Sequence, residues 1–245
     1  MESAKDYVQL VQEPWGKIFY DLLFIQLDLP PSPKLKILDF GAGLGVTSNY
    51  YAAWHEVIAV EPNDEMLENR HTKNPYTVIR GGIESVAEYE NDHFDMVLCH
   101  NVLEYVEEKE PIIAELMRVL KPGGVLSLVK HNRVGRIFQT AVFKNDPKKA
   151  LSLLDAKTND KSNYLGTQYI YSNDDAAKMV KKYGGTIDRI MGMRAFYALG
   201  QDNAVKYDDE WYQNMVALET AVAHIDEYKN AAFLSHLLII KTLGL

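Results

Sequence analysis

Short apolar runs alternate with amphipathic stretches along the first half of the chain. Compact apolar runs predict buried strands over residues 35–40, 57–60, 76–79, 94–99 and 125–129. Between these runs, apolar residues recur at three- and four-residue spacing, which predicts helices that end near residue 54 or cover 63–70 and 112–120. Strands that alternate with helices in this way are typical of a parallel sheet covered by helices on both faces.

Helical spacing also covers residues 4–29, and the prolines at 30, 31 and 33 should end it. After the fifth apolar run the pattern becomes irregular, and regular elements return as a helix over 173–183, a strand over 186–191, a helix over 208–228 and a strand over 233–241. We therefore expect one α/β domain over 1–245, with an N-terminal helical cap over 1–34 and an acceptor-side insertion over 131–170.

The composition is that of an ordinary globular protein, with 47% hydrophobic and 24% charged residues. No apolar run approaches the length of about 18 residues that a membrane helix needs, and the N-terminus does not have the order of an export signal. The chain contains one cysteine, Cys99, and its 7 histidines show no metal-ligand spacing. We expect a cytoplasmic protein without a disulfide, a metal site or a membrane partner.

Charge is distributed unevenly along the chain. The whole sequence has a formal net charge of −8, whereas residues 131–200 hold 12 basic and 6 acidic side chains. Because salt screens charge over roughly 10 Å, a local basic face attracts an anionic partner even on an acidic protein. This segment predicts an anionic partner, unless its lysines only solvate a helix face.

A glycine-rich turn follows the first predicted strand, in the run Asp39-Phe40-Gly41-Ala42-Gly43-Leu44-Gly45. The spacing differs from the dinucleotide-binding pattern and from a P-loop, so the turn favours a nucleoside ligand without a phosphate, such as S-adenosylmethionine. Glu61 ends the second strand about twenty residues later, where a carboxylate accepts hydrogen bonds from ribose hydroxyls. The two signals in this order predict a cofactor site.

Four segments carry a resemblance to a known family: residues 37–45, Glu61-Pro62-Asn63, residues 100–106 and residues 120–124. Together they resemble the class I S-adenosylmethionine-dependent methyltransferases over about residues 35–130. The resemblance implies a Rossmann-like, mostly parallel seven-stranded sheet with an antiparallel last strand and helices on both faces. Residues 100–106, 122–132 and 192–196 are similar to the bacterial tRNA 5-carboxymethoxyuridine methyltransferase family, which implies a carboxylate on a modified tRNA wobble uridine as acceptor.

The resemblance also implies a set of cofactor-binding residues. In this sequence they are Trp15, Lys17, Asp39, Gly41, Ala42, Gly43, Gly45, Glu61, Pro62, Met66, Ile83, Glu84, His100 and Asn101. Asp39 would orient the amine of S-adenosylmethionine and Glu61 the ribose, while Met66, unless it only fills the core, would cover the adenine. Trp15 and Lys17 would close the pocket, and S-adenosylhomocysteine would be the product.

The acceptor determines which catalytic groups are needed. A carboxylate is ionised at neutral pH and needs a cation or donor to steer it, for which Arg194, Arg133 and Asn132 are the candidates. A hydroxyl or amine acceptor would instead need a base, and His100 or His131 could serve. Aromatic residues of the second half could stack on an extruded base or form core; they are Tyr164, Tyr169, Tyr171, Phe196 and Tyr197.

Two other functions remain open at this point. A small-molecule methyltransferase with the same fold agrees with the acidic overall charge. A cofactor-binding protein without turnover would bind S-adenosylmethionine and transfer no methyl group. The fold alone does not choose among them, because recognition of the acceptor depends on the insertion.

Overall fold

The computed structural model describes residues 4–155, 160–162 and 166–242. The chain divides into two compact units, and each is built from separate stretches of sequence. We call residues 29–129, 173–189 and 237–245 the sheet unit, and residues 1–28, 130–172 and 190–236 the helical unit. The predicted division into one domain, a cap over 1–34 and an insertion over 131–170 stays a prediction.

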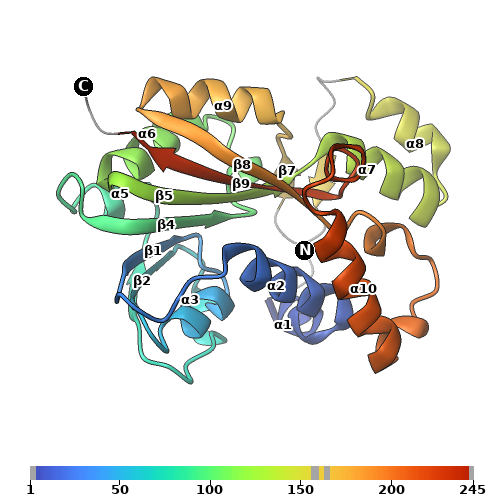
Figure 1. The fold of residues 1–245 in the computed structure, drawn as a ribbon, viewed down its shortest axis with the longest axis horizontal. Coiled ribbons are helices and arrows are strands. Elements are labelled where there is room, and N and C mark those ends of the chain that lie inside the picture. The colour runs from blue at the N-terminus through green and yellow to red at the C-terminus, as the bar shows by residue number, and fades with distance from the viewer. Residues whose placement is uncertain (1–3, 156–159, 163–165, 243–245) are drawn as a thin grey trace. The chain divides into compact units, whose positions relative to one another are not determined.

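A seven-stranded sheet organises the sheet unit, and three of its strands continue along the chain into the helical unit (Figure 1). The strands are β1 (Lys36–Phe40), β2 (Glu56–Glu61), β3 (Thr77–Arg80), β4 (Phe94–His100), β5 (Leu120–His131), β8 (Gly185–Met193) and β9 (Leu234–Lys241). Their order is β3-β2-β1-β4-β5-β9-β8. The first five strands pair in parallel and the last strand in the chain is antiparallel, which confirms the predicted fold class.

The helices of the sheet unit connect successive strands. They are α3 (Val46–Tyr51), α4 (Asp64–Glu68), α5 (Ile83–Val86), the 3-10 turn η1 (Leu103–Tyr105), α6 (Glu110–Val119) and α9 (Asn173–Lys182). Asn63 caps α4 by accepting a hydrogen bond from the Met66 N–H at 3.2 Å. On α9, Lys182 pairs with Glu110 of α6 at 2.8 Å. The crossover helices of a parallel sheet are therefore present where the hydrophobic pattern places them.

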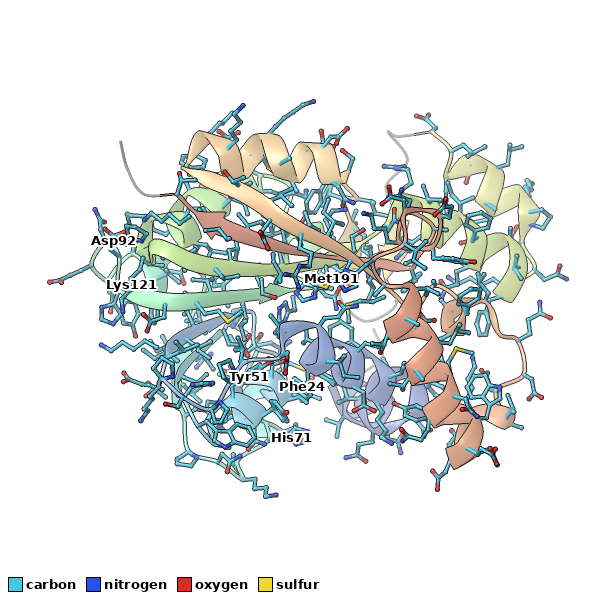
Figure 2. All side chains as sticks on the ribbon, in the orientation of Figure 1. Phe24, Tyr51, His71, Asp92, Lys121 and Met191 are labelled. Atoms are coloured by element: carbon cyan, nitrogen blue, oxygen red, sulfur yellow. The ribbon has the colours of Figure 1, made fainter. Side chains whose placement is uncertain are left out.

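The central strands supply the core of the sheet unit. Ile37 and Leu38 of β1 and Val97 and Leu98 of β4 are fully buried, and Leu38 pairs with Val97 in the parallel register. Burial on both faces explains why these strands read as continuous apolar runs. Charged residues lie where the central strands start: Figure 2 shows Asp92 and Lys121 near the starts of β4 and β5.

The helical unit contains two helices from the N-terminus and the segments that interrupt the regular pattern. Its elements are α1 (Ala4–Gln12), α2 (Pro14–Leu27), α7 (Arg133–Phe138), the π-helical turn η2 (Gln139–Phe143), α8 (Pro147–Ser152), β6 (Asp160–Ser162), β7 (Gly166–Gln168), η3 (Tyr197–Leu199), η4 (Val205–Tyr207), α10 (Asp209–Val222) and α11 (Asp226–Lys229). The helix α10 contacts α2 within this unit. No helix among the residues with a described structure could span a membrane.

Two predicted helices are each divided in the structure. The helix expected over 4–29 is interrupted at Glu13, whose ψ of 158° is extended. Pro14 causes this break, because a proline disfavours helical dihedrals in the residue before it. The helix expected over 208–228 ends at Val222 and resumes as α11. The fifth strand, expected from residue 125, already begins at Leu120.

Candidate functional site

The glycine turn lies between β1 and α3 and folds back against the end of β2. The N–H groups of Gly41 and Ala42 both donate to the Val60 carbonyl, at 2.8 and 3.1 Å. Gly41 and Gly43 have φ values of 74° and 54°, in the left-handed region that favours glycine. A Cβ atom added at Gly43 would meet no protein atom within 4 Å among the described residues. The turn therefore leaves open space above Gly43, as a ligand that crosses it requires.

Glu61 ends β2 and joins the turn to the second strand. Its carboxylate accepts the Gly43 N–H at 2.8 Å through Oε2 and the Asn63 N–H at 2.9 Å through Oε1. Glu61 is buried. Its charge is therefore held against the open side of the turn, where a ribose would need an acceptor.

Asp39 lies one position before the end of β1 and is buried beneath the turn. Its Oδ2 accepts a hydrogen bond from the Ser48 hydroxyl at 2.6 Å. Burial raises the pKa of the Asp39 carboxyl to about 6, against a smaller lowering effect of the Ser48 hydrogen bond, and the nearby charge of Glu61 raises it further. A cationic amine would stabilise the ionised form of this carboxyl.

The end of β4 lies beside the turn, because β4 pairs with β1. A Cβ atom at Gly41 would lie 2.3 Å from Cγ2 of Val102, so only glycine fits there without movement of that side chain. Asn101 has a left-handed φ of 55°, and its side-chain oxygen is buried without a hydrogen-bond partner among the described residues. A buried acceptor of this kind needs a donor, which a bound ligand can supply.

His100 occupies the last position of β4. Its Nε2 lies 2.8 Å from the Ser127 hydroxyl on β5, and burial lowers the pKa of the imidazole to about 3. Such an imidazole is neutral at neutral pH and is a weak base. Ser127 was not predicted from the sequence as a partner of His100. The available signal was a polar serine within the apolar run 125–129, and in the structure this serine is fully buried.

The remaining cofactor candidates of the sheet unit lie on, or just before, the helices that follow β2 and β3. Met66 is 6% exposed on α4, so it contributes to the core whether or not it also covers an adenine. Pro62 is exposed and Ile83 half-buried. Glu84 accepts the Gly82 N–H at 2.6 Å. These positions agree with the predicted roles but do not test them.

S-adenosylmethionine is the cofactor that the resemblance implies, and the sheet unit fits it. The open turn at Gly43 accommodates a ligand, Glu61 offers a buried carboxylate, and Asn101 offers an unpartnered acceptor. Asp39 adds a second buried acid. Both acids and the turn come from the carboxyl ends of parallel strands, where α/β sheets bind ligands.

Trp15 and Lys17 belong to α2 in the helical unit. The Trp15 ring packs edge-on against Tyr207, with 6.4 Å between ring centroids, and the Lys17 ammonium lies 4.3 Å from the centroid of the Tyr212 ring. Their predicted role in closing the cofactor pocket stays a prediction.

Two of the acceptor candidates use their side chains to hold the helical unit together. Asn132 caps α7, since Oδ1 accepts the Val134 N–H at 3.3 Å, and its Nδ2 donates to the carbonyls of Asn230 and Ala232, both at 2.9 Å. The Arg133 guanidinium donates to backbone carbonyls, which are those of Leu153, Asp155 and Ile170. Both side chains therefore make hydrogen bonds that stabilise the helical unit, and these bonds explain the residue types without an acceptor.

Replacing Asn132 by alanine is expected to lower the free energy of unfolding by about 1–2 kcal/mol, because it removes a helix cap and two further hydrogen bonds. Asn132→Asp keeps the capping oxygen and loses both donors, so it separates the two contributions. Urea denaturation measures both variants. Unchanged stability together with lost methyl transfer would instead assign Asn132 to the acceptor.

Arg194 follows β8 and differs from these two residues. Its Nε is buried and has no hydrogen-bond partner among the described residues, and its backbone is left-handed with a φ of 62°. Glu219, on α10, accepts the N–H groups of the residues just after Arg194. Glu219 and Lys206 were not predicted as parts of a site, since no local spacing connects either residue with Arg194.

His131 and the aromatic candidates lie in several environments. Nδ1 of His131 is 3.3 Å from Nη1 of Arg136. Tyr171 and Tyr197 are buried, which agrees with the core alternative, whereas Phe196 and Tyr169 are half-buried. Tyr164 lies outside the described residues.

The basic segment 131–200 does not form one structural element. Its residues divide between the helical unit and the sheet unit. Arg136 is buried, and Lys182 pairs with Glu110, so part of the positive charge is used inside the fold. Among the residues of the predicted insertion whose burial is described, three lysines are exposed, at 144, 148 and 149. The surface charge available to an anionic partner is therefore smaller than the sequence count suggests.

Comparison with known proteins shows that part of the chain is similar to methyltransferases. Residues 38–128 match the family described as methyltransferase domain. The chain is 32% identical over 109 residues to human thiol S-methyltransferase TMT1A, which covers 41% of this chain and 44% of that protein. It is 30% identical over 136 residues to tRNA 5-carboxymethoxyuridine methyltransferase of Escherichia coli K12, which covers 52% of each. The chain spans about half the length of these curated relatives.

Solved structures extend the likeness in fold to most of the chain. A putative S-adenosylmethionine-dependent methyltransferase from Listeria monocytogenes superposes with a TM-score of 0.62 at 16% identity, over 92% of this chain and 97% of that one. The family resemblance, the fold class and the cofactor expected from them are confirmed. Residues 38–128 carry a methyltransferase domain, and the chain has the fold of the class I S-adenosylmethionine-dependent methyltransferases.

Proposed function

We propose that this protein is an S-adenosylmethionine-dependent methyltransferase whose preferred acceptor is the carboxylate of a modified tRNA wobble uridine. The main support for methyltransferase activity is the open glycine turn at Gly43, which leaves space for a ligand and is held by a 2.8 Å hydrogen bond from the Gly43 N–H to Glu61. Asp39 and Asn101 add a buried acid and an unpartnered acceptor at the same end of the sheet.

The chemistry requires little from the protein beyond positioning. S-adenosylmethionine supplies a methyl group from a sulfonium centre, so a carboxylate acceptor becomes a neutral ester without the transfer of a proton. Holding the reacting groups in line then accounts for most of the rate acceleration. A carboxylate acceptor also agrees with His100, because an imidazole with a pKa of about 3 is poorly suited to remove a proton.

Support for the tRNA acceptor comes from two sources. One is the similarity to the E. coli tRNA 5-carboxymethoxyuridine methyltransferase over 136 residues. The other is the exposed lysine group of the insertion, at positions 144, 148 and 149. Arg194 is the acceptor candidate that this proposal favours, because Asn132 and Arg133 already make hydrogen bonds within the helical unit.

Incubation with labelled S-adenosylmethionine and bulk tRNA tests the acceptor. We expect label in the tRNA fraction as a base-labile ester, and tRNA binding that weakens by about tenfold or more when salt rises from about 50 to 200 mM. Reversal of the charges at Lys148 and Lys149 should weaken this binding, whereas reversal at Lys178, in the sheet unit, serves as the matched control.

A small-molecule methyltransferase is the second candidate, and the similarity to a thiol S-methyltransferase and the net charge of −8 favour it. Label in the metabolite fraction, with salt-independent or undetectable tRNA binding, would select it over the tRNA enzyme. Cofactor binding without label in any fraction would instead indicate a protein without turnover.

A further inference from the structure

Several polar side-chain atoms are buried in the helical unit, and two that lie close to the end of β8 have no hydrogen-bond partner among the described residues. These two are Nε of Arg194 and the hydroxyl of Tyr197. The Arg194 guanidinium lies 5.1 Å from the centroid of the Phe233 ring and 5.6 Å from that of Tyr197. It is therefore packed among aromatic rings, where an unpaired charge is costly.

The nearby acid, Glu219, makes no ion pair with Arg194. Burial lowers the pKa of the Arg194 guanidinium, and the charge of Glu219, which favours the charged form, opposes this shift without reversing it. Glu219 is 1% exposed, and both of its carboxylate oxygens are occupied by backbone N–H groups. Oε2 accepts from Ala195 at 2.7 Å, and Oε1 accepts from Phe196 and Tyr197, each at 2.8 Å. No carboxylate of the described residues forms an ion pair with Arg194. Glu219 instead fixes the turn that carries Arg194 and Tyr197.

A second cation increases the positive charge of this cluster. Lys206 is 4% exposed, and its ammonium lies 4.7 Å from the centroid of the Tyr197 ring. It donates to the Gly200 carbonyl and to Oδ1 of Asn203, both at 2.9 Å, so its hydrogen bonds go to neutral groups. Burial, and then the charge of Arg194, lower the pKa of Lys206. An anion bound here would relieve the repulsion between the two cations.

We propose that Arg194 and Tyr197 form a binding site for a carboxylate, which under the proposed function is that of the acceptor, and that Glu219 is the positioning residue of this site. The guanidinium offers a planar pair of donors that matches a carboxylate, and the tyrosine hydroxyl offers one more. Methylation removes the charge of the acceptor, so this site binds the substrate and releases the neutral ester.

Binding of phenoxyacetate, followed by calorimetry and by the NMR signal of the Arg194 Nε–H group, tests the site without methyl transfer. We expect Arg194→Gln to weaken this binding by about tenfold or more and Tyr197→Phe by about three- to tenfold. Arg189→Gln, which changes an exposed arginine of β8, the strand just before Arg194, should leave it unchanged. The uncharged phenoxyacetamide should not bind.

Glu219→Gln separates positioning from simple electrostatics. If Glu219 orients the turn, the variant binds phenoxyacetate more weakly, because an amide group cannot accept all three N–H groups. If its charge only opposed the anion, binding would become tighter, and the positioning role would be wrong. Far-UV circular dichroism and urea denaturation check that each variant is folded.

Two results would overturn the carboxylate site itself. One is phenoxyacetate binding that is absent from the wild-type protein or unchanged in Arg194→Gln. The other is inorganic phosphate binding as tightly as phenoxyacetate with the same dependence on Arg194, which would make this a phosphate site. S-adenosylmethionine binding is measured separately, so a failure of the proposed methyltransferase function is distinguished from a failure of this site.

Discussion

Replacing Glu61 by alanine is expected to weaken S-adenosylmethionine binding by about 100-fold or more, since a charge-assisted hydrogen bond contributes about 1.5–3 kcal/mol and the ribose offers two hydroxyls. The carboxylate also holds the turn, through the Gly43 N–H at 2.8 Å and the Asn63 N–H at 2.9 Å. The variant should therefore lose both a ligand contact and the geometry of the loop.

Isothermal titration calorimetry measures the affinity of the Glu61→Ala variant for S-adenosylmethionine. Urea denaturation without cofactor measures its free energy of unfolding and so shows whether the weaker binding comes from a destabilised fold. Glu56→Ala provides the matched control, because Glu56 is an exposed carboxylate at the opposite end of β2. Cofactor affinity within about threefold of the wild type in Glu61→Ala would remove Glu61 from the binding site.

Replacing Asp39 by asparagine is expected to have opposite effects on stability and on cofactor binding. Burial raises the pKa of Asp39 from 3.8 to about 6 in the folded protein. The stability that the protonated carboxyl contributes is therefore complete below about pH 4 and is lost as pH rises through about 6, by about 3 kcal/mol in total. Asparagine resembles the protonated form and keeps an acceptor for the Ser48 hydroxyl.

The cofactor-free Asp39→Asn variant should consequently be more stable than the wild type at about pH 8, by about 1–3 kcal/mol, and similar to it at about pH 4. Its affinity for S-adenosylmethionine should fall by about tenfold or more, because the predicted partner of the carboxylate is a cationic amine. Urea denaturation at both pH values and calorimetry at the higher one measure these effects. Asp188→Asn, at an exposed position, is the control, and a loss of stability in Asp39→Asn at high pH would contradict the argument.

The order of strands and helices in the sheet unit follows closely from the sequence. The apolar runs near β1, β2 and β4 were predicted within about two residues of their observed bounds, because a strand buried on both faces needs a continuous apolar run. The break at Glu13 was missed, although Pro14 was its signal. At that point regular spacing on both sides of the proline concealed the interruption.

The acceptor candidates show how far residue type and motif position can identify a site. Asn132 and Arg133 were reasonable choices by chemistry, but the structure directs their donors to backbone carbonyls of the helical unit. Arg194 was chosen on the same grounds, and the Nε of its side chain is buried without a hydrogen-bond partner among the described residues. Only the folded chain separates these cases, because the partners come from distant parts of the sequence.

By itself, the sequence determined the strand-turn-helix order, the glycine turn and the acid at the end of the second strand, since periodicity and turn chemistry act over a few residues. Three contacts were decided only by the tertiary structure. Ser127 lies against His100, Glu219 accepts the Ala195 N–H in the turn after Arg194, and Asn132 donates a hydrogen bond to the Ala232 carbonyl. These contacts join residues 27, 24 and 100 positions apart, respectively. Their geometry depends on how separate segments pack, which no local pattern encodes.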